Sequence, residues 1–130
     1  MSWAIVWYYQ FTPNDAYDYD ACWELINADI HVGGQKRKVS MQLNRNGFLY
    51  VIDRTNGKLL AANSFEKVNW ASHVDDETGR PVETEIAKSI RAGKATEHWP
   101  STRGGKNWQH AAFNPETGLL YANTFHEGRL

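Results

Sequence analysis

The sequence contains a single cysteine and no long apolar run, and each of these shortages excludes a class of protein. Cys22 is alone, so an intrachain disulfide is excluded and we expect this residue to be a small, buried apolar side chain. No window approaches the roughly 18 apolar residues that a membrane-spanning helix needs. The opening "MSWAIVWYYQF" lacks both the basic segment and the cleavage site of a signal peptide. We therefore expect neither a membrane span nor a signal peptide.

Charge of one sign is also scarce. The 130 residues include 14 Lys and Arg against 15 Asp and Glu, which gives a formal net charge of -1. A balanced charge gives no electrostatic basis for binding nucleic acid or an anionic membrane. The one basic cluster, "QKRKV" at residues 35–39, is short, and we interpret it as a solvated loop or an edge strand. We therefore expect no nucleic-acid partner.

Aromatic and β-branched residues are plentiful, and they gather in short segments. The chain is 42% hydrophobic and has six Trp, enough apolar side chain for one globular unit over residues 1–130. Turn-forming residues separate the segments, a pattern typical of antiparallel strands. The predicted strands are "AIVWYYQF", "ELINADIHV", "KVSMQLN", "GFLYVID", "KLLAANSF", "AAFNP" and "GLLYANTF". Residues 75–99 are polar instead, and we expect a long excursion there with one helical turn.

Two related phrases repeat along the chain, "NRNGFLYVIDRTNGKLLAAN" at residues 44–63 and "NPETGLLYANTF" at residues 114–125. Both carry an Asn-x-x-Gly turn, or a near variant of it, into an aromatic strand, and Asn56-Gly57 predicts a second tight turn with positive φ. Repetition on this scale is typical of β-propellers, whose blades have four strands each. The fold class predicted is all-β: about three blades, forming an open arc of antiparallel four-stranded sheets.

The stretch "PNDAYDYDAC" crowds carboxylates among aromatic rings. Asp18 and Asp20 are two residues apart, so in an extended segment both leave one face while Tyr17 and Tyr19 point to the other. Two adjacent like charges are costly unless a cation binds between them, and carboxylate oxygens are the ligands that Ca²⁺-like ions prefer. From these residues alone, an Asp-rich turn in which Asp15 caps the chain remains the alternative.

Several phrases together resemble the pyrroloquinoline quinone (PQQ)-dependent alcohol dehydrogenases, the family of methanol and ethanol dehydrogenases. They are "WYYQFTPNDAYDYDA", "LNRNGFLYVIDRTNGKLLAA", "FEKVNWAS" and "GGKNWQHAAFNPETGLLYAN", in family order over nearly the whole chain. Members of this family are eight-bladed propellers several times longer than this chain. The resemblance therefore implies an interior fragment, a partial quinoprotein propeller domain over residues 1–130.

The resemblance implies roles for the paired aspartates. Asp18 matches the family's aspartate beside the metal, which is proposed to act as the general base and which we also assign as a metal ligand. The position of Asp20 is an Asp in lanthanide-dependent members and a small or neutral residue in calcium-dependent ones. "DYD" thus resembles the lanthanide type, with Ca²⁺ as the alternative ion, and a trivalent ion calls for one more anionic ligand.

Three further residues are implied to contact the cofactor. A guanidinium such as that of Arg45 can stabilise the negative charge that appears on a reduced quinone. From the residues alone, an Arg paired with Asp53 or left solvated in a hairpin turn is the alternative. In "GGKNWQH", Asn107 matches the family's PQQ contact, and Trp108 is expected as a pocket wall.

The implied activity is oxidation of a primary alcohol to an aldehyde with PQQ and a metal ion. The resemblance implies a cytochrome c as electron acceptor and a periplasmic location, and a homo-oligomer is one expectation for a chain that leaves strand edges uncovered. The isolated 130 residues are expected to be inactive, because family metal ligands and the residue beneath the quinone lie outside them. A non-catalytic propeller-repeat binding or scaffold module is the alternative function.

Overall fold

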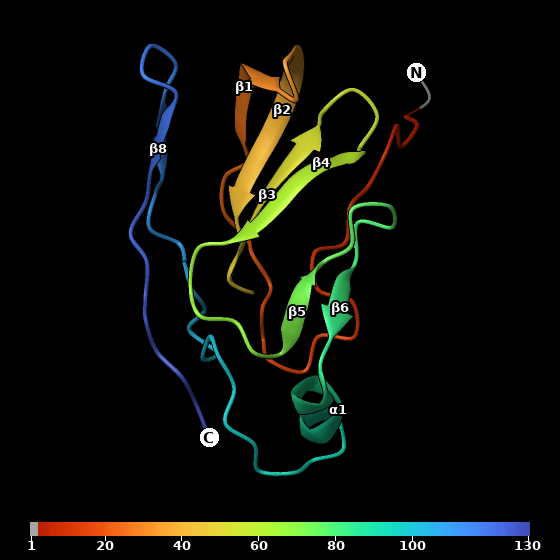
Figure 1. Ribbon diagram of the computed structural model, residues 1–130, viewed down its shortest axis with the longest axis vertical. Coiled ribbons are helices and arrows are strands. Elements are labelled where there is room, and N and C mark those ends of the chain that lie inside the picture. Colours follow the sequence, from red (N-terminus) through yellow and green to blue (C-terminus); the bar gives the residue numbers. More distant parts are fainter. Residues whose placement is uncertain (1–2) are drawn as a thin grey trace.

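The computed structural model describes residues 3–130, and its regular secondary structure consists almost entirely of antiparallel strands joined by long loops (Figure 1). A four-stranded sheet has the order β1-β2-β3-β4, and two further sheets pair β5 with β6 and β7 with β8. The strands are β1 (Ile26–Val32), β2 (Gln35–Leu43), β3 (Phe48–Asp53), β4 (Leu59–Ser64), β5 (Ala71–Val74), β6 (Pro81–Glu83), β7 (Ala112–Asn114) and β8 (Leu119–Tyr121). One helix, α1 (Glu85–Arg91), follows β6. Within residues 3–130, no helix is both long and apolar enough to cross a membrane.

This arrangement confirms the all-β prediction and six of the seven predicted strands. Three sheets are present among the described residues, but only the first has four strands. The predicted strand at residues 4–11 is wrong, since that segment pairs with no neighbouring strand. Its side chains hold it instead: Trp7 Nε1 donates to Arg54 O at 2.9 Å, and the Tyr9 hydroxyl donates to Gly79 O at 2.5 Å.

One kind of turn closes three of the hairpins. In the β3–β4 turn, the carboxylate of Asp53 accepts from the amide and hydroxyl of Thr55, and Gly57 N–H donates back to Asp53 O. Gly57 has the positive φ, +77°, predicted for this turn. The same acid-or-amide residue four positions before a glycine recurs at Asp75–Gly79 and Asn114–Gly118. The hairpin β5–β6 within residues 71–83 was not predicted, although this spacing marks it.

Aromatic residues fill the main core, which lies between the four-stranded sheet and the hairpin β5–β6. Trp70 is fully buried there, and its Nε1 donates to Asn46 O at 3.0 Å. The rings of Tyr17 and Tyr19 stack with centroids 4.8 Å apart, and both approach Trp70. Other buried members are Phe48, Tyr50, Ile52, Leu59, Ala71, Val74 and Ala87. The packing of these two rings in the core therefore fixes the position of residues 17–19.

Two smaller expectations meet different outcomes. Cys22 was expected to be buried, but the structure exposes it, because it follows the exposed Asp20 on a segment outside the core. The basic cluster is solvent-exposed over residues 35–38, as predicted, at the end of β2 that pairs only with β1. Here Arg37 lies 3.8 Å from the Asp53 carboxylate.

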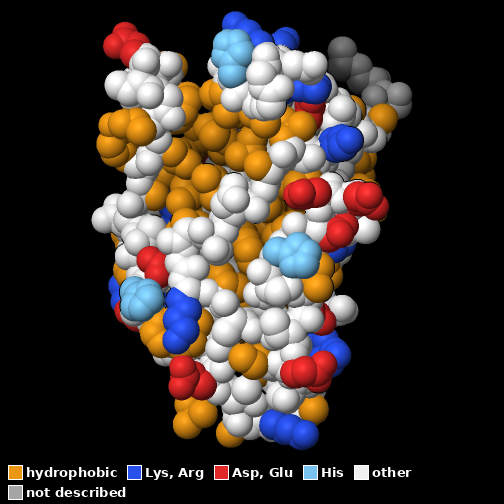
Figure 2. Space-filling model, in the orientation of Figure 1, with side chains coloured by type: hydrophobic (Ala, Val, Ile, Leu, Met, Phe, Trp, Pro, Cys, Tyr) orange, Lys and Arg blue, Asp and Glu red, His pale blue; other side chains and the backbone are white. Residues whose placement is uncertain are grey.

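Hydrophobic side chains gather on the visible face between the four-stranded sheet and the C-terminal hairpin (Figure 2). The groove there has a volume of about 480 Å³. Its lining residues come from β1 and from the segment around β7: Ile26, Asn27, Ala28, Asp29, Ala111, Phe113 and Pro115. The hairpin β7–β8 therefore stands beside the sheet without joining it (Figure 1).

Candidate functional site

The segment Asp15–Asp20 presents its tyrosines to the core and two of its aspartates to solvent. The Asp15 carboxylate accepts from the amides of Tyr17 at 2.9 Å and Tyr19 at 2.7 Å, so it caps the turn. Tyr17 and Tyr19 are each only 2% exposed. Burial raises the pKa of Tyr17 to about 12 and also raises the pKa of Tyr19, so both phenols stay neutral. Asp15 is therefore structural, and it caps the turn as the alternative interpretation of this stretch proposed.

The carboxylates of Asp18 and Asp20 are open to solvent, with side-chain exposures of 77% and 68%. The predicted separation of aspartates from tyrosines is thus observed, but by a different backbone geometry. Asp18 has φ of +68°, in the left-handed region, where the prediction assumed an extended segment. Asp18 lies within the turn that the Asp15 carboxylate caps, and Asp tolerates the left-handed conformation better than most residues.

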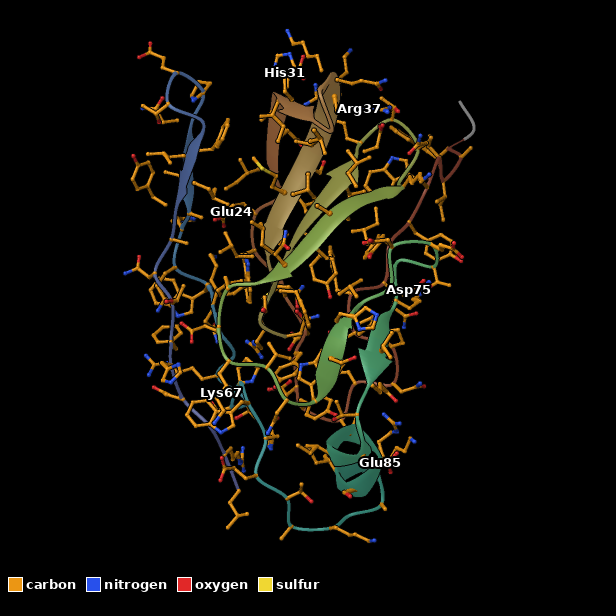
Figure 3. The ribbon with its side chains drawn as sticks, in the orientation of Figure 1. Glu24, His31, Arg37, Lys67, Asp75 and Glu85 are labelled. Carbon is orange, nitrogen blue, oxygen red and sulfur yellow. The ribbon has the colours of Figure 1, made fainter. Side chains whose placement is uncertain are left out.

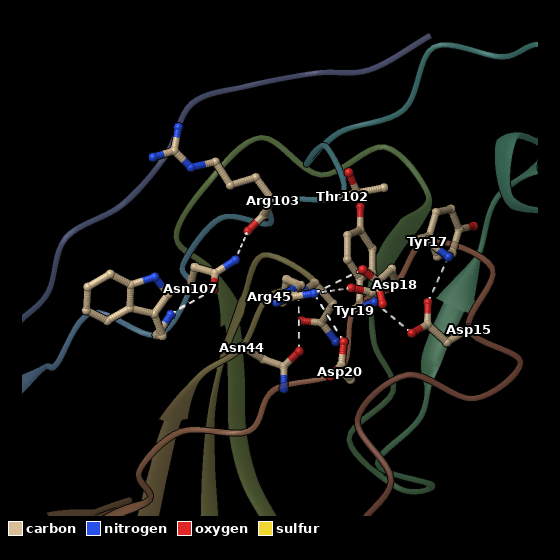
Figure 4. Close-up of polar contacts among 12 residues, drawn as sticks. Asp15, Tyr17, Asp18, Tyr19, Asp20, Asn44, Arg45, Thr102, Arg103 and Asn107 are labelled. Atoms are coloured by element: carbon tan, nitrogen blue, oxygen red, sulfur yellow. Dashed lines mark hydrogen bonds and ion pairs between the residues drawn. The ribbon is translucent and has the colours of Figure 1, made fainter.

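Arg45 is held in place by the turn between β2 and β3. Asn44 and Asn46 flank it, are almost fully buried, and use their side-chain oxygens to accept the amides of Asn46 and Phe48 at 3.1 Å each. Gly47 N–H closes the turn on Asn44 O. These bonds leave Arg45 at the tip, with its side chain directed at the aspartate segment (Figure 4).

One guanidinium nitrogen of Arg45 meets three oxygen atoms of that segment. Nη1 lies 2.5 Å from Asp18 O, 3.5 Å from Asp18 Oδ2 and 3.1 Å from Asp20 Oδ1. The alternative pairing with Asp53 is therefore not found. Two carboxylates and a carbonyl that converge on one cationic atom form the hard oxygen set that Ca²⁺-like and lanthanide ions prefer. The residues thus fit a metal ion in donor chemistry.

Gly104 and Gly105 lie directly against Arg45. Gly105 N–H donates to Arg45 O at 2.9 Å, and Gly104 has φ of +83°. A Cβ at position 104 would lie 2.0 Å from Arg45 Cγ and 2.7 Å from Arg45 O. The paired glycines therefore allow one loop to reach the back of the arginine.

Replacing Gly104 with Ala is expected to destabilise the chain by about 1–3 kcal/mol and to displace Arg45, because both the positive φ and the close contact disfavour a side chain. Urea unfolding measures the first effect. Gly93→Ala is the matched control, since Gly93 has φ of +72° but a Cβ added there would meet no atom within 4 Å. Equal losses in both variants would show that the contact with Arg45 has no energetic weight.

The structure does not bring the remaining candidates into contact with Arg45. Asn107 Nδ2 donates to Arg103 O at 2.8 Å, and Asn107 Oδ1 accepts from Trp108 N at 2.9 Å. Figure 4 places Asn107 on the other side of Arg45 from Asp18. The Trp108 side chain is 68% exposed. Asp18, Asp20 and Arg45 thus form one cluster, and Asn107 with Trp108 form a neighbouring loop.

Sequence reasoning missed two charged residues beneath that loop. Lys106 is 1% exposed, and Glu24 Oε1 lies 3.8 Å from its Nζ. The phrase "GGKNWQH" contained the lysine, but nothing in the sequence indicated that its side chain turns inward. Within residues 3–130, no group of three or more His, Cys, Asp or Glu side chains is arranged to hold a metal ion.

Comparisons with known proteins identify the family of the chain. The family described as "Glucose/ethanol/alcohol dehydrogenase, beta-propeller domain", of the PQQ type, matches residues 4–82. A quinohemoprotein alcohol dehydrogenase, ADH IIB, of Pseudomonas putida is 48% identical over 118 residues, covering 90% of this chain and 17% of the relative. A lanthanide-dependent methanol dehydrogenase of Methylacidiphilum fumariolicum (strain SolV) is 42% identical over 118 residues, covering 91% of this chain and 19% of the relative.

A solved structure supports the same assignment. The quinohemoprotein alcohol dehydrogenase from Comamonas testosteroni superposes with a TM-score of 0.87 at 40% identity, covering 94% of this chain and 18% of that one. The chain thus spans about a fifth of the length of these relatives, and the prediction of a propeller fragment is confirmed. On its sequence and its fold, the chain belongs to the PQQ-type glucose, ethanol and alcohol dehydrogenase family, through the β-propeller domain of that family.

Proposed function

We propose that this chain is part of a PQQ-dependent dehydrogenase that oxidises a primary alcohol to an aldehyde. The observation that carries the proposal is the convergence of Asp18 and Asp20 on Arg45 Nη1. Family membership supports the quinone, and the likeness to a lanthanide-dependent relative supports a metal ion beside it. A lanthanide is the ion proposed, with Ca²⁺ as the alternative.

Different residues of this chain would bind the metal ion, accept the proton and contact the quinone. Asp18 and Asp20 would supply carboxylate oxygens to the ion, and bound PQQ with that ion would supply the two-electron acceptor for the alcohol. An Asp18 carboxylate oxygen would accept the alcohol's hydroxyl proton, because the side chain is 77% exposed and therefore open to a substrate. Arg45 would donate hydrogen bonds to quinone oxygens and stabilise negative charge there.

The neighbouring loop would complete the cofactor pocket. The Asn107 amide, which donates to Arg103 O in this structure, would donate to a quinone oxygen, and the exposed Trp108 ring would offer an apolar wall. A cytochrome c as electron acceptor is proposed from the likeness to quinohemoprotein relatives, and a periplasmic location from the family.

Titration of the purified chain with PQQ, in the presence of La³⁺, tests this proposal. Quenching of tryptophan fluorescence and a shift in quinone absorbance should saturate in the wild type. Arg45→Met should weaken binding about tenfold or more, since a charge-assisted hydrogen bond is lost without a large change in size. The control Arg129→Met changes an exposed arginine distant in sequence and should bind normally. Equal binding by both variants would remove Arg45 from the proposed site.

A further inference from the structure

Lys106 is a buried cation, with only 1% of the residue exposed. Its Nζ donates to Asn107 O at 3.0 Å, although a lysine ammonium has three donors. Burial lowers the pKa of Lys106, and the nearby Glu24 only partly opposes that effect. An interior ammonium with few partners is costly to the fold. The charge at this position is therefore better explained by the contact of Lys106 with the Asn107 carbonyl than by a role in packing.

Glu24 holds the far end of the same loop. Its Oε1 accepts the amide of Ala111 at 2.7 Å, and its Oε2 lies 3.4 Å from His110 Nδ1. Burial alone would raise the pKa of Glu24, but the Ala111 amide, Lys106 and His110 lower it below its usual value. Figure 3 shows Glu24 between the four-stranded sheet and the C-terminal segment. The Lys106–Glu24 pair therefore contacts both ends of the loop 106–111, through Asn107 O at one end and the Ala111 amide at the other.

Trp23 connects the Lys106–Glu24 pair to the aspartate cluster. Its Nε1 donates to Leu43 O at 3.1 Å, which fixes the ring against β2. The ring lies 5.8 Å from the Arg45 guanidinium carbon and 4.8 Å from Lys106 Nζ, within cation–π range of both. One indole therefore contacts the arginine of the cluster and the lysine of the loop.

We propose that Lys106 and Glu24 are positioning residues that hold the Asn107–Trp108 loop at a fixed place beside Arg45 for quinone binding. The inference rests on the proposed function, because it assigns the loop to the quinone. The pair acts on PQQ through the backbone carbonyl of Asn107 and does not touch the cofactor itself. It has no contact with the carboxylates of Asp18 and Asp20, so metal binding does not depend on it.

Lys106→Met keeps the length and apolar stem of the side chain and removes the charge. We expect it to raise the PQQ dissociation constant at least about tenfold while the La³⁺ dissociation constant stays within about twofold. Hydrogen exchange at the Ala111 amide should quicken about tenfold in both Lys106→Met and Glu24→Gln. Lys106→Arg should restore part of the PQQ affinity, and Lys94→Met, at an exposed lysine, is the matched control.

Other outcomes would overturn the proposal. Unchanged PQQ affinity in Lys106→Met, or parallel loss of PQQ and La³⁺ binding with a lower Tm, would reduce the lysine to a structural role. If Lys106→Met does not fold, Glu24→Gln gives the same comparison. If the wild type binds no PQQ, the proposed function fails for the chain. Hydrogen exchange at the Ala111 amide still tests whether Lys106 and Glu24 hold the loop, because unchanged exchange in both variants would contradict that role.

Discussion

Replacing Asp18 by Asn is expected to lower the rate of alcohol oxidation by about a hundred- to ten-thousand-fold, the usual loss when a general base is removed. The experiment uses a full-length dehydrogenase that carries this segment. Asn keeps the size of the side chain and one oxygen ligand but cannot accept the hydroxyl proton. It also tolerates the left-handed φ of +68° at this position, so the turn should survive. Steady-state oxidation of ethanol with a dye acceptor measures the rate.

The matched control is Asp76→Asn, an exposed aspartate in the β5–β6 turn, which should oxidise ethanol normally. PQQ content is measured in each protein, because a rate lost with the cofactor says nothing about the base. A near-normal rate in an Asp18→Asn enzyme that retains its PQQ would assign the base to another residue.

Replacing Asp20 by Ser is expected to lower the preference for La³⁺ over Ca²⁺ by at least about tenfold. One carboxylate about 2.5 Å from an ion gains about 6–7 kcal/mol for each extra unit of ion charge at an effective dielectric of about 20, before the larger desolvation of the trivalent ion is subtracted. About 1.4 kcal/mol changes the ratio of two dissociation constants tenfold, so a small part of this electrostatic gain is enough to decide the preference between the ions. Asp20 is 68% exposed and within reach of the same cation position as Asp18.

Calorimetric titration of the chain with each ion gives the two dissociation constants and their ratio. Asp29→Ser is the control, because Asp29 is an aspartate of β1 that pairs with Arg54 instead. An unchanged ratio in Asp20→Ser would show that this carboxylate does not bind the ion. The alternative of an Asp-rich turn would then be the better interpretation.

The sequence could predict the parts of this structure that depend on local pattern. Alternation predicted that Tyr17 and Tyr19 point away from Asp18 and Asp20, as they do, and the turn glycine Gly57 has the expected positive φ. The Gly57 turn follows from backbone sterics within a few residues, whereas the separation at Asp18 comes from a left-handed residue and not from the extended segment assumed. The resemblance added Arg45, whose approach to the aspartates comes from a turn 25 residues or more along the chain.

Features that depend on distant partners could not be predicted. Residues 4–11 have the composition of a strand, but a strand needs a neighbour, and their aromatic side chains bind hairpin carbonyls instead. Lysine is usually a surface residue, yet Trp23 and Glu24, far away in the sequence, enclose Lys106. Cys22 is small and apolar, but no part of the core reaches it.

Terbium luminescence is the most direct test of the central claim, that Asp18 and Asp20 form one metal-binding corner. Tb³⁺ bound there would lie near Tyr19 and Trp23, whose excitation sensitises its emission at short range. We expect saturable emission from the wild-type chain, lost in Asp18→Ala/Asp20→Ala and retained in the control Asp76→Ala/Glu77→Ala, which removes two exposed carboxylates elsewhere. Equal emission from all three proteins would contradict the account.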